Sequence, residues 1–423
     1  MCPAYSRQSR GLVASEAMLD LSVLAQRHIG PVGVAVSGGG DSVAMLLSLS
    51  DWAQAHGIDL AVATVDHGLR DESAAEAVWV GDLCRRLGLP HRTLLWARDA
   101  DTSGNLAEQA RDARRVLLAR WIAQQGGQTV LLGHTQDDVA ETFLMRLARG
   151  SGLDGLSAMR PVHDREGVRW LRPLLNASRD DLRRYLRDRG QVWHDDPTNE
   201  DDSYTRARTR KALAVLRDLD IDSQRIARTA HRLSLNRDVL VRTTDQLAMS
   251  CLHQSKFGEL VLSNATFRSA PEVLQERLLQ QILQHFIGPT HPPRHTSIAR
   301  LRSEITRGAS MTLAGVQMRW TNAASYFYRE ASALPARANL SRASTLWDHR
   351  WTVAGGGNSA SQIGPLGTEG LRQCGPRPQG LRASVAVGLP ALWEGPKLVA
   401  APFLSPYDGV VFRLRRFGVG APH

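Results

Sequence analysis

Between residues 32 and about 150, short apolar runs alternate with segments of helical periodicity, and this alternation restricts the fold more than any other feature. Repeated strand–helix–strand units make right-handed crossovers, so their strands run parallel and their helices cover both faces of the sheet. The pattern therefore predicts an α/β fold with a Rossmann-like parallel sheet. The predicted strands are 32–36, 60–65, 91–96 and 129–132, and the predicted helices are 43–56, 73–87 and 106–125. A further strand is expected at 171–175 and a charged helix at 178–189.

The sequence changes character twice after this region. Ile226, Leu233, Leu240 and Leu247 recur every seven residues, which predicts the apolar face of a long helix in a helical domain. Residues 311–328 alternate as in a hairpin and open a small C-terminal α+β segment, in which 354–380 read as a Gly/Pro-rich loop. The predicted domains are therefore 1–215, 216–308 and 309–423.

Composition narrows the class of protein. With 43% hydrophobic and 22% charged residues, the chain has the composition of a soluble globular protein. No run approaches the roughly 18 apolar residues of a membrane span, and the start lacks a secretory pattern, so a cytoplasmic location is expected. The four cysteines form no C-x-x-C pair, which argues against a zinc or iron–sulfur site.

Positive charge is concentrated in the second half of the chain. The net charge of +10 divides into −3 over residues 1–200 and +13 over residues 201–423. A surplus of this size attracts polyanions such as nucleic acid, although charge alone does not establish such binding. If the chain has a basic partner surface, it is expected after residue 200.

The strongest local signal is the hexapeptide Ser37-Gly38-Gly39-Gly40-Asp41-Ser42, between a predicted strand and a helix. Glycines there let backbone N–H groups approach phosphate oxygens, and the helix start adds positive potential. It is not a Walker loop, because it has no lysine, nor a dinucleotide fingerprint, because Val43 stands where a third glycine is needed. A plain glycine turn is the competing interpretation.

This hexapeptide resembles the PP-loop of the N-type ATP pyrophosphatases, which split ATP into AMP and pyrophosphate while adenylating an oxygen. Further segments resemble the tRNA(Ile)-lysidine synthases of that superfamily, in the same order along about half of the chain. They are 65–70, 133–142, 172–175, 193–199 and the Arg-rich 206–210. Ala207 and Thr209 depart from the family's usual Arg-Asn-Arg-Ile-Arg element. The resemblance implies a sheet of the PP-loop ATPase type.

Ligands of an open parallel sheet bind beyond the carboxyl ends of its strands, so the loops after the first, second and fourth strands should surround one crevice. With the resemblance, this predicts an ATP site made of Ser37, Gly38, Gly39, Gly40, Asp41, Ser42, Asp66 and His67. Carboxylates beside a triphosphate repel it unless a cation intervenes, so Asp41 and Asp137 are predicted to hold Mg²⁺, with Asp138 as the third catalytic acid. Helix capping is the competing role for these acids.

Substrate contacts are predicted next to these acids. Glu141 shares a helical face with Asp137 or Asp138 and is predicted to receive the ammonium of a lysine substrate. His134 is predicted to contact the base, or else to be a structural histidine. The remaining predicted contacts are to tRNA phosphates, for which a solvated helix face is the alternative, and involve Arg206, Arg208 and Arg210, with Lys211 beside them.

The resemblance implies a ligase that uses ATP, Mg²⁺ and free L-lysine to modify the wobble cytidine of the CAU-anticodon tRNA(Ile). Two alternatives stay open. A PP-loop tRNA thiolase would add sulfur to a pyrimidine, but such enzymes generally use paired cysteines or an iron–sulfur cluster. A catalytically silent tRNA-binding relative is disfavoured by the intact acids. The sequence leaves a homodimer open and indicates no membrane partner.

Overall fold

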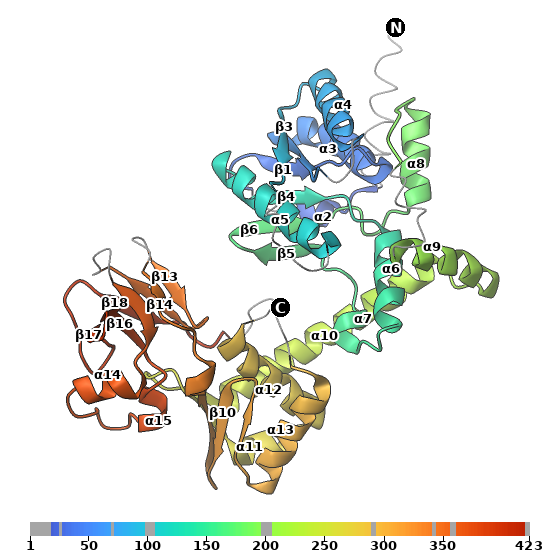
Figure 1. Cartoon of the computed structure of the whole chain (residues 1–423). Coiled ribbons are helices and arrows are strands. Elements are labelled where there is room, and N and C mark those ends of the chain that lie inside the picture. Colours follow the sequence, from blue (N-terminus) through green and yellow to red (C-terminus); the bar gives the residue numbers. More distant parts are fainter. Residues whose placement is uncertain are drawn as a thin grey trace. The chain divides into compact units, whose positions relative to one another are not determined.

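The computed structural model describes residues 18–24, 28–68, 72–97, 106–195, 205–288, 293–340, 344–355 and 361–418. The chain divides into two compact units, the first ending at Arg237 and the second beginning at Asp238 (Figure 1). No helix among the described residues has both the length and the apolar character needed to cross a bilayer. The predicted domain boundaries near residues 215 and 308 stay predictions.

The first unit contains the predicted alternation of strands and helices. Its elements up to the end of the parallel strands are α2 (Leu21–Leu24), β1 (Val32–Ala35), α3 (Gly40–His56), β2 (Leu60–Asp66), α4 (Glu72–Arg86), β3 (His91–Leu95), α5 (Leu106–Gln124), β4 (Thr129–Leu132), α6 (Gln136–Leu147), α7 (Leu153–Leu156), β5 (Val162–Arg165) and β6 (Val168–Leu171). Helices follow: α8 (Arg179–Asp188), α9 (Thr205–Leu216), the 3-10 turn η2 (Arg217–Leu219) and α10 (Ser223–Cys251), which continues past Arg237.

The six strands form one sheet in the order β3-β2-β1-β4-β6-β5. All neighbours are parallel except β5, which pairs antiparallel with β6 as an edge hairpin. β1 lies at the centre, where Val32 pairs with Leu60 of β2 on one side and with Thr129 of β4 on the other. The chain order reverses between β1 and β4, and a crevice for ligands forms at such a switch point.

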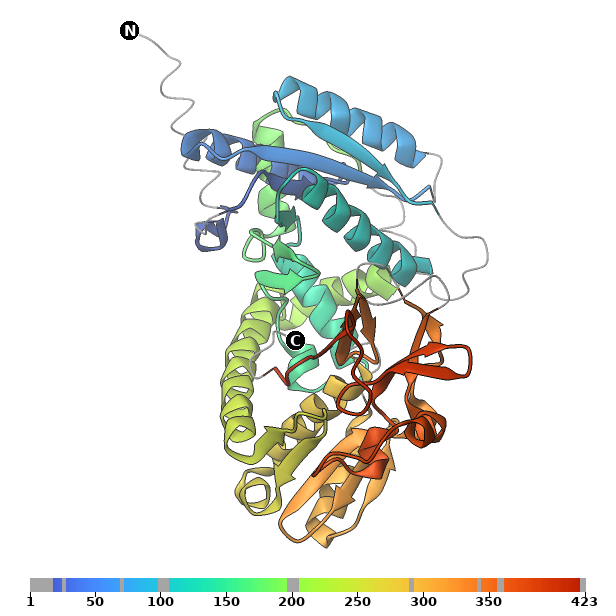
Figure 2. The same ribbon diagram turned by 90° about the vertical axis from the view of Figure 1, so that its left-hand side faces the viewer.

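Apolar side chains cover both faces of this sheet, as the sequence predicts. One core joins the strands to α3, α4 and α8, whereas a second core packs α5 against the opposite face. Figure 2 shows α4 and α5 on opposite sides of the strands. Neighbouring residues of one strand serve both cores, because Val62 belongs to the first and Ala63 to the second. The predicted α/β class is therefore confirmed.

Two local predictions are wrong in their details. The strand expected at 171–175 is β6, which ends at Leu171, because Pro173 cannot donate to a ladder and the chain turns. Leu174 is nevertheless fully buried, so its apolar character marks the core without marking a strand. Ser73, which has capping-box spacing with Glu76, lies inside α4 instead of capping it.

The second unit combines helices with three small sheets. Its elements are β7 (Leu252–Gln254), β8 (Leu260–Ser263), α11 (Asn264–Ser269), α12 (Glu272–Ile287), α13 (His295–Arg307), β9 (Met311–Leu313), β10 (Val316–Trp320), β11 (Ala324–Arg329), η3 (Ala331–Ala333), β12 (Ala338–Asn339), β13 (Thr345–Trp347), β14 (Trp351–Ala354), β15 (Gln362–Pro365), α14 (Gly367–Gln373), α15 (Ala383–Ala386), β16 (Pro390–Glu394), β17 (Lys397–Ala400) and β18 (Val411–Leu414). The strand orders are β7-β8-β11-β10-β9, β12-β15-β16-β17 and β13-β14-β18.

Several expectations can be compared with this unit. The hairpin expected at 311–328 is present as β9, β10 and β11. The heptad positions from Ile226 to Leu247 lie on α10, as predicted. The stretch 354–380, expected as a loop, contains β15 and α14, and residues 356–360 lie outside the described part.

Candidate active site

The glycine-rich loop after β1 presents the unpaired backbone amides of a helix start. Gly38 has a φ of 92°, which glycine adopts without strain, and α3 begins two residues later at Gly40. The N-cap Gly39 supplies no side-chain hydrogen bond to the helix. Ser42 stabilises the turn, because its Oγ donates to the carbonyl of Gly39 at 2.9 Å and accepts from the Ser37 amide at 3.2 Å. Free amides and a helix N-terminus make this loop suitable for an anion such as phosphate.

Neighbouring segments approach this loop closely. A Cβ added to Gly40 would lie 3.3 Å from the Trp193 ring, and one added to Gly133 would lie 3.2 Å from the Ser42 Cα. The His194 amide also donates to the Gly38 carbonyl at 3.0 Å. The segment at 193–195, part of the motif predicted at 193–199, therefore packs on the loop. Residues 196–199 of that motif lie outside the described part.

The end of β2 contributes less directly to the site than the glycine-rich loop does. Asp66 Oδ1 accepts from the Gly68 amide at 2.9 Å and from the Ser73 hydroxyl at 2.6 Å, so this atom organises the turn. His67 is partly buried, and this burial, with the nearby Arg114, lowers its pKa. Its Nδ1 is buried and has no hydrogen-bond partner among the described residues. Contact of Asp66 and His67 with nucleotide stays a prediction.

The remaining acids of the site lie on α6, which follows the turn after β4. Thr135 caps α6 in a capping box with Asp138, whose Oδ2 accepts from the Thr135 amide at 2.8 Å. Asp137 lies one position earlier in the first turn, and Glu141 lies one turn further on with a side chain that is 0% exposed. Buried carboxylates require partners, and these come from other helices.

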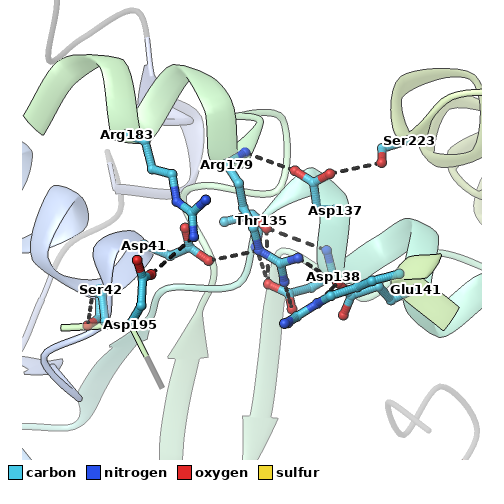
Figure 3. A network of polar contacts seen from close by, with 12 residues as sticks. Asp41, Ser42, Thr135, Asp137, Asp138, Glu141, Arg179, Arg183, Asp195 and Ser223 are labelled. Carbon is cyan, nitrogen blue, oxygen red and sulfur yellow. Dashed lines mark hydrogen bonds and ion pairs between the residues drawn. The ribbon is translucent and has the colours of Figure 1, made fainter. Parts of the chain in front are cut away.

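Arg179, the first residue of α8, joins the acids into one network (Figure 3). Its Nε donates to Asp41 Oδ2 at 3.2 Å, and its two terminal nitrogens donate to Asp138 Oδ1 at 2.9 Å and to Glu141 Oε1 at 2.5 Å. Its backbone amide donates to Asp137 Oδ2 at 2.8 Å. One residue therefore binds four of the five acids that the sequence predicts for the site, all except Asp66.

Helix α9 adds two more arginines to this cluster. Arg210 Nε donates to Glu141 Oε1 at 2.7 Å, and Arg206 Nε lies 3.9 Å from Glu141 Oε2. Arg208 does not join them, because its guanidinium is exposed and donates to the Thr205 hydroxyl at 3.4 Å. Of the three arginines predicted to contact substrate, two therefore lie at the acids.

The two departures from the Arg-rich motif lie on the packed side of α9. Ala207 and Thr209 are both buried, and the Thr209 hydroxyl donates to the Thr205 carbonyl at 2.8 Å. The packing of this side joins Leu213 to Ala140 of α6. The replacements consequently affect how α9 packs and leave the charged side chains of the motif in place.

Burial and charge shift the pKa values of the site in different directions. Burial raises the pKa of Asp41, and Arg179 only partly opposes it. Burial would also raise the pKa of Asp138, but the charge of Arg179 and the hydrogen bond from the Thr135 amide lower it below its usual range. The pKa of His134 falls to about 3, through burial and the positive charge of Arg172, against the opposing effect of Asp138. Arg172 Nε donates to His134 Nδ1 at 3.2 Å, so His134 is neutral and carries its proton on Nε2.

Arg179 and Ser223 escaped the sequence-based prediction, which includes Arg172 only as part of the segment 172–175 and gives it no role. The Ser223 hydroxyl donates to Asp137 Oδ1 at 2.8 Å, across 86 positions of the sequence. Arg179 carries a usable signal, because a cation at the first position of a helix opposes the helix dipole and needs an outside partner. Ser223 has no such mark, since a serine at the start of a long helix is ordinary.

The donor set suits a hard cation. Asp41 and Asp138 are held by one guanidinium, so their oxygens converge on a shared positive charge, and Mg²⁺ prefers such carboxylate oxygens. Asp137 instead has one oxygen on Ser223 and the other on the Arg179 amide. As arranged here, no three side chains of the described residues form a ready-made ligand set for one metal ion.

The fold and the loop define a class of protein. Residues 16–216 match the family model of the PP-loop domain. The chain is 40% identical to the tRNA(Ile)-lysidine synthase of Ruegeria pomeroyi over 379 residues, which cover 89% of this chain and 90% of the relative. It is 33% identical to that of Wolbachia pipientis wMel, covering 79% of this chain and 80% of the relative. The chain belongs to the tRNA(Ile)-lysidine synthase family.

The comparison with solved structures gives a weak match. The U34-tRNA thiolase NcsA from Methanococcus maripaludis, with its [4Fe-4S] cluster, is 19% identical, with a TM-score of 0.45. The match covers 53% of this chain and 78% of that one. It is a distant likeness.

Proposed function

We propose that this protein ligates L-lysine to the wobble cytidine of the CAU-anticodon tRNA(Ile), using ATP and releasing AMP and diphosphate. Family membership supports the class of reaction. The observation that carries the proposal is the position of the acids: Asp41 belongs to the PP-loop and shares one guanidinium with Asp138 and Glu141. Groups suited to a triphosphate and groups suited to a cationic amine therefore lie together.

The reaction is proposed in two steps. The cytosine O2 attacks the α-phosphate of ATP, the bond to the diphosphate breaks, and diphosphate leaves. The lysine side-chain amine then attacks the activated carbon, loses a proton, and expels AMP with the oxygen. Activation is needed because oxide is a very poor leaving group, whereas AMP is a good one. A base in this reaction has to leave the stacked anticodon loop to reach the pocket.

The residues of the site are proposed to divide these tasks. The amides of the loop from Gly38 to Gly40 bind phosphate oxygens. Asp41, with Asp137 or Asp138, would hold Mg²⁺, which when bound offsets the negative charge of the triphosphate. Glu141 would bind the lysine ammonium. Each of these groups lies on the first unit, at the carboxyl ends of β1 and β4.

Neutral His134 supports a further assignment. Its Nδ1 accepts from Arg172, so its Nε2–H is the donor that remains for the base or a phosphate. Because its pKa lies near 3, it stays neutral throughout the physiological range and acts as a donor without changing charge. The exposed Arg208 and the basic second unit are proposed to bind the tRNA backbone. The cytoplasm is the proposed location of the reaction.

The thiolase alternative finds less support. Cys84 and Cys251 are buried, and burial raises the pKa of each thiol to about 11, so neither is prepared to act as a sulfur carrier. Cys374 is half-buried, and burial also raises its pKa. A thiolase using these three cysteines would need thiols that ionise more easily.

The test incubates the purified protein with ATP, Mg²⁺, labelled lysine and the CAU-anticodon isoleucine transcript. A transcript with uridine at the wobble position is the control. Lysine incorporated into the first transcript only, with AMP released, is the expected result. ATP–diphosphate exchange without lysine incorporation would refute the ligase and favour another adenylating enzyme, and tRNA binding without exchange would favour a silent relative.

Asp41→Asn tests the role of the PP-loop acid. Loss of its charge should lower turnover at least about 100-fold, because a ligand to the triphosphate cation contributes several kcal/mol to transition-state stabilisation. Turnover is measured at saturating Mg²⁺ and lysine, with tRNA binding as a check on folding. Full turnover by the variant would remove Asp41 from the cation site.

A further inference from the structure

Three carboxylates of the site share one cation that belongs to the chain itself. We call Asp41, Asp138 and Glu141 the acid cluster; their side chains are 25%, 10% and 0% exposed. All three nitrogens of the Arg179 guanidinium donate to this cluster, one to each acid (Figure 3). The acids come from α3 and α6 and the arginine from α8, so these contacts are made only by the folded unit.

The acid cluster is not saturated by its arginines. Glu141 Oε1 accepts from both Arg179 and Arg210, whereas its Oε2 is buried and accepts no hydrogen bond from the described residues. Arg206 Nε forms an ion pair with this oxygen but lies 3.9 Å away, beyond hydrogen-bond distance. A fully buried carboxylate oxygen without a donor is costly, and a donor delivered by a ligand would relieve that cost. Beside its ion pair with Arg206, the atom can therefore still accept a hydrogen bond from a ligand with N–H groups.

A second cation at the cluster would be repelled by Arg179. A guanidinium and an ammonium or metal ion beside the same carboxylates repel each other strongly where water is largely excluded. The backbone of Arg179 does not have to move for its side chain to leave. Its amide is fixed to Asp137 Oδ2, and the adjacent N-cap Ser178 accepts from the Asp181 amide at 3.1 Å.

We propose that Arg179 is an internal counter-cation: it occupies the acid cluster in the free enzyme and is displaced when a cation of the reaction, Mg²⁺ or the lysine ammonium, binds there. The identity of these cations rests on the proposed function. Arg179 then acts as a positioning residue, which keeps the acids ionised and together until the substrates arrive. Substrate cations bind in competition with it, and binding is weaker than the bare cluster would allow.

The test compares cation binding by the wild type, Arg179→Gln and the control Arg184→Gln. Arg184 lies on the same helix, is 66% exposed and pairs with Asp181, away from the cluster. Calorimetric titration and thermal shift are measured separately with Mg²⁺, with L-lysine, and with Nε-acetyl-lysine, which has no side-chain ammonium. The two cation arms identify which one competes with the arginine.

Arg179→Gln should bind Mg²⁺ or lysine about tenfold more tightly than the wild type, a coupling of ordinary size between two competing groups. Its thermal shift with that cation should increase accordingly, while Arg184→Gln behaves as the wild type and acetyl-lysine has no added effect. Equal or weaker binding of both cations by Arg179→Gln would overturn the proposal, because a structural or co-binding arginine predicts that result.

A second variant covers loss of folding. Arg179→Lys keeps the charge, but one ammonium cannot reach three carboxylates. This variant should therefore bind the cation more tightly than the wild type, by a smaller factor than Arg179→Gln. If Arg179→Gln does not fold, the absence of this effect in Arg179→Lys refutes the proposal. The proposed function can be refuted independently of this proposal. That outcome is a wild type that does not transfer lysine to tRNA, while Arg179→Gln still binds Mg²⁺ more tightly than the wild type.

Discussion

Gly133 lies where β4 meets the PP-loop, and its replacement by alanine tests how tightly that loop is positioned. An added Cβ would lie 3.2 Å from the Ser42 Cα and 3.4 Å from the Ser42 amide nitrogen. Both are backbone atoms of the first turn of α3, so no side-chain rotation relieves the contact. Gly133 has no positive φ, and alanine therefore adds no backbone strain of its own.

The size of the effect follows from this contact. Carbon atoms pack at about 3.5–4.0 Å, so the first turn of α3 must shift by a few tenths of an ångström. Such overpacking costs about 1–3 kcal/mol, and the lower entropy of the unfolded alanine chain offsets about 0.4–1 kcal/mol. The net loss in the free energy of unfolding should be about 1–2 kcal/mol. Since a misplacement of about 1 Å can cost 100-fold in rate, kcat/KM for ATP should fall about tenfold.

Gly375→Ala is the matched control, because a Cβ there meets nothing within 4 Å and its φ is not positive. Urea unfolding and ATP–diphosphate exchange with tRNA are measured for both variants. Gly133→Ala should lose stability and ATP efficiency together, whereas the control should lose neither. If Gly133→Ala matched its control in both assays, the close approach would not be what positions the loop.

Two further predictions concern a cap and a buried histidine. Ser178→Ala removes the N-cap of α8 and should cost about 1 kcal/mol in urea unfolding; an unchanged midpoint would show that the cap bond contributes nothing. The pKa of His285 falls to about 3 through burial and the charges of Arg350 and Arg415. Stability should therefore be complete above pH about 6.5 and decline as the pH falls from there toward 3, because only the unfolded chain takes up the proton. His285→Gln should reduce this decline by up to about 1.4 kcal/mol per pH unit, and identical pH profiles would contradict the assignment.

Most of the first unit could be predicted because its strands and helices carry local signals. The run from Val32 to Val36 is apolar throughout, as a strand buried on both faces must be, and the helix after the loop follows at once. The prediction of a strand at 171–175 failed because these residues are buried without pairing in the sheet. Leu174 is in the core although the strand ends before Pro173. An apolar run indicates that a segment is buried, but a buried turn is apolar as well and forms no strand.

The site was predictable to the extent that its residues are close in sequence. The PP-loop and the acids of α6 stand at strand ends, and their convergence follows from the rule for parallel sheets. The partners of those acids do not follow from it, because Arg179 and Ser223 arrive on helices whose placement depends on tertiary packing. The position of Arg179 at the start of α8 indicates that it needs an outside partner, but no local pattern states which acids that partner is made of.

The order of these residues along the chain has a consequence for synthesis. The acids end at Glu141, whereas Arg179 follows 38 positions later. At about 10 residues per second, the acids precede Arg179 out of the ribosome by about 4 seconds. During that interval the parallel sheet can form, but its carboxylates have only solvent cations as partners. A nascent chain of this protein therefore passes through a stage in which free Mg²⁺ is the available counter-ion, before its own arginines replace it.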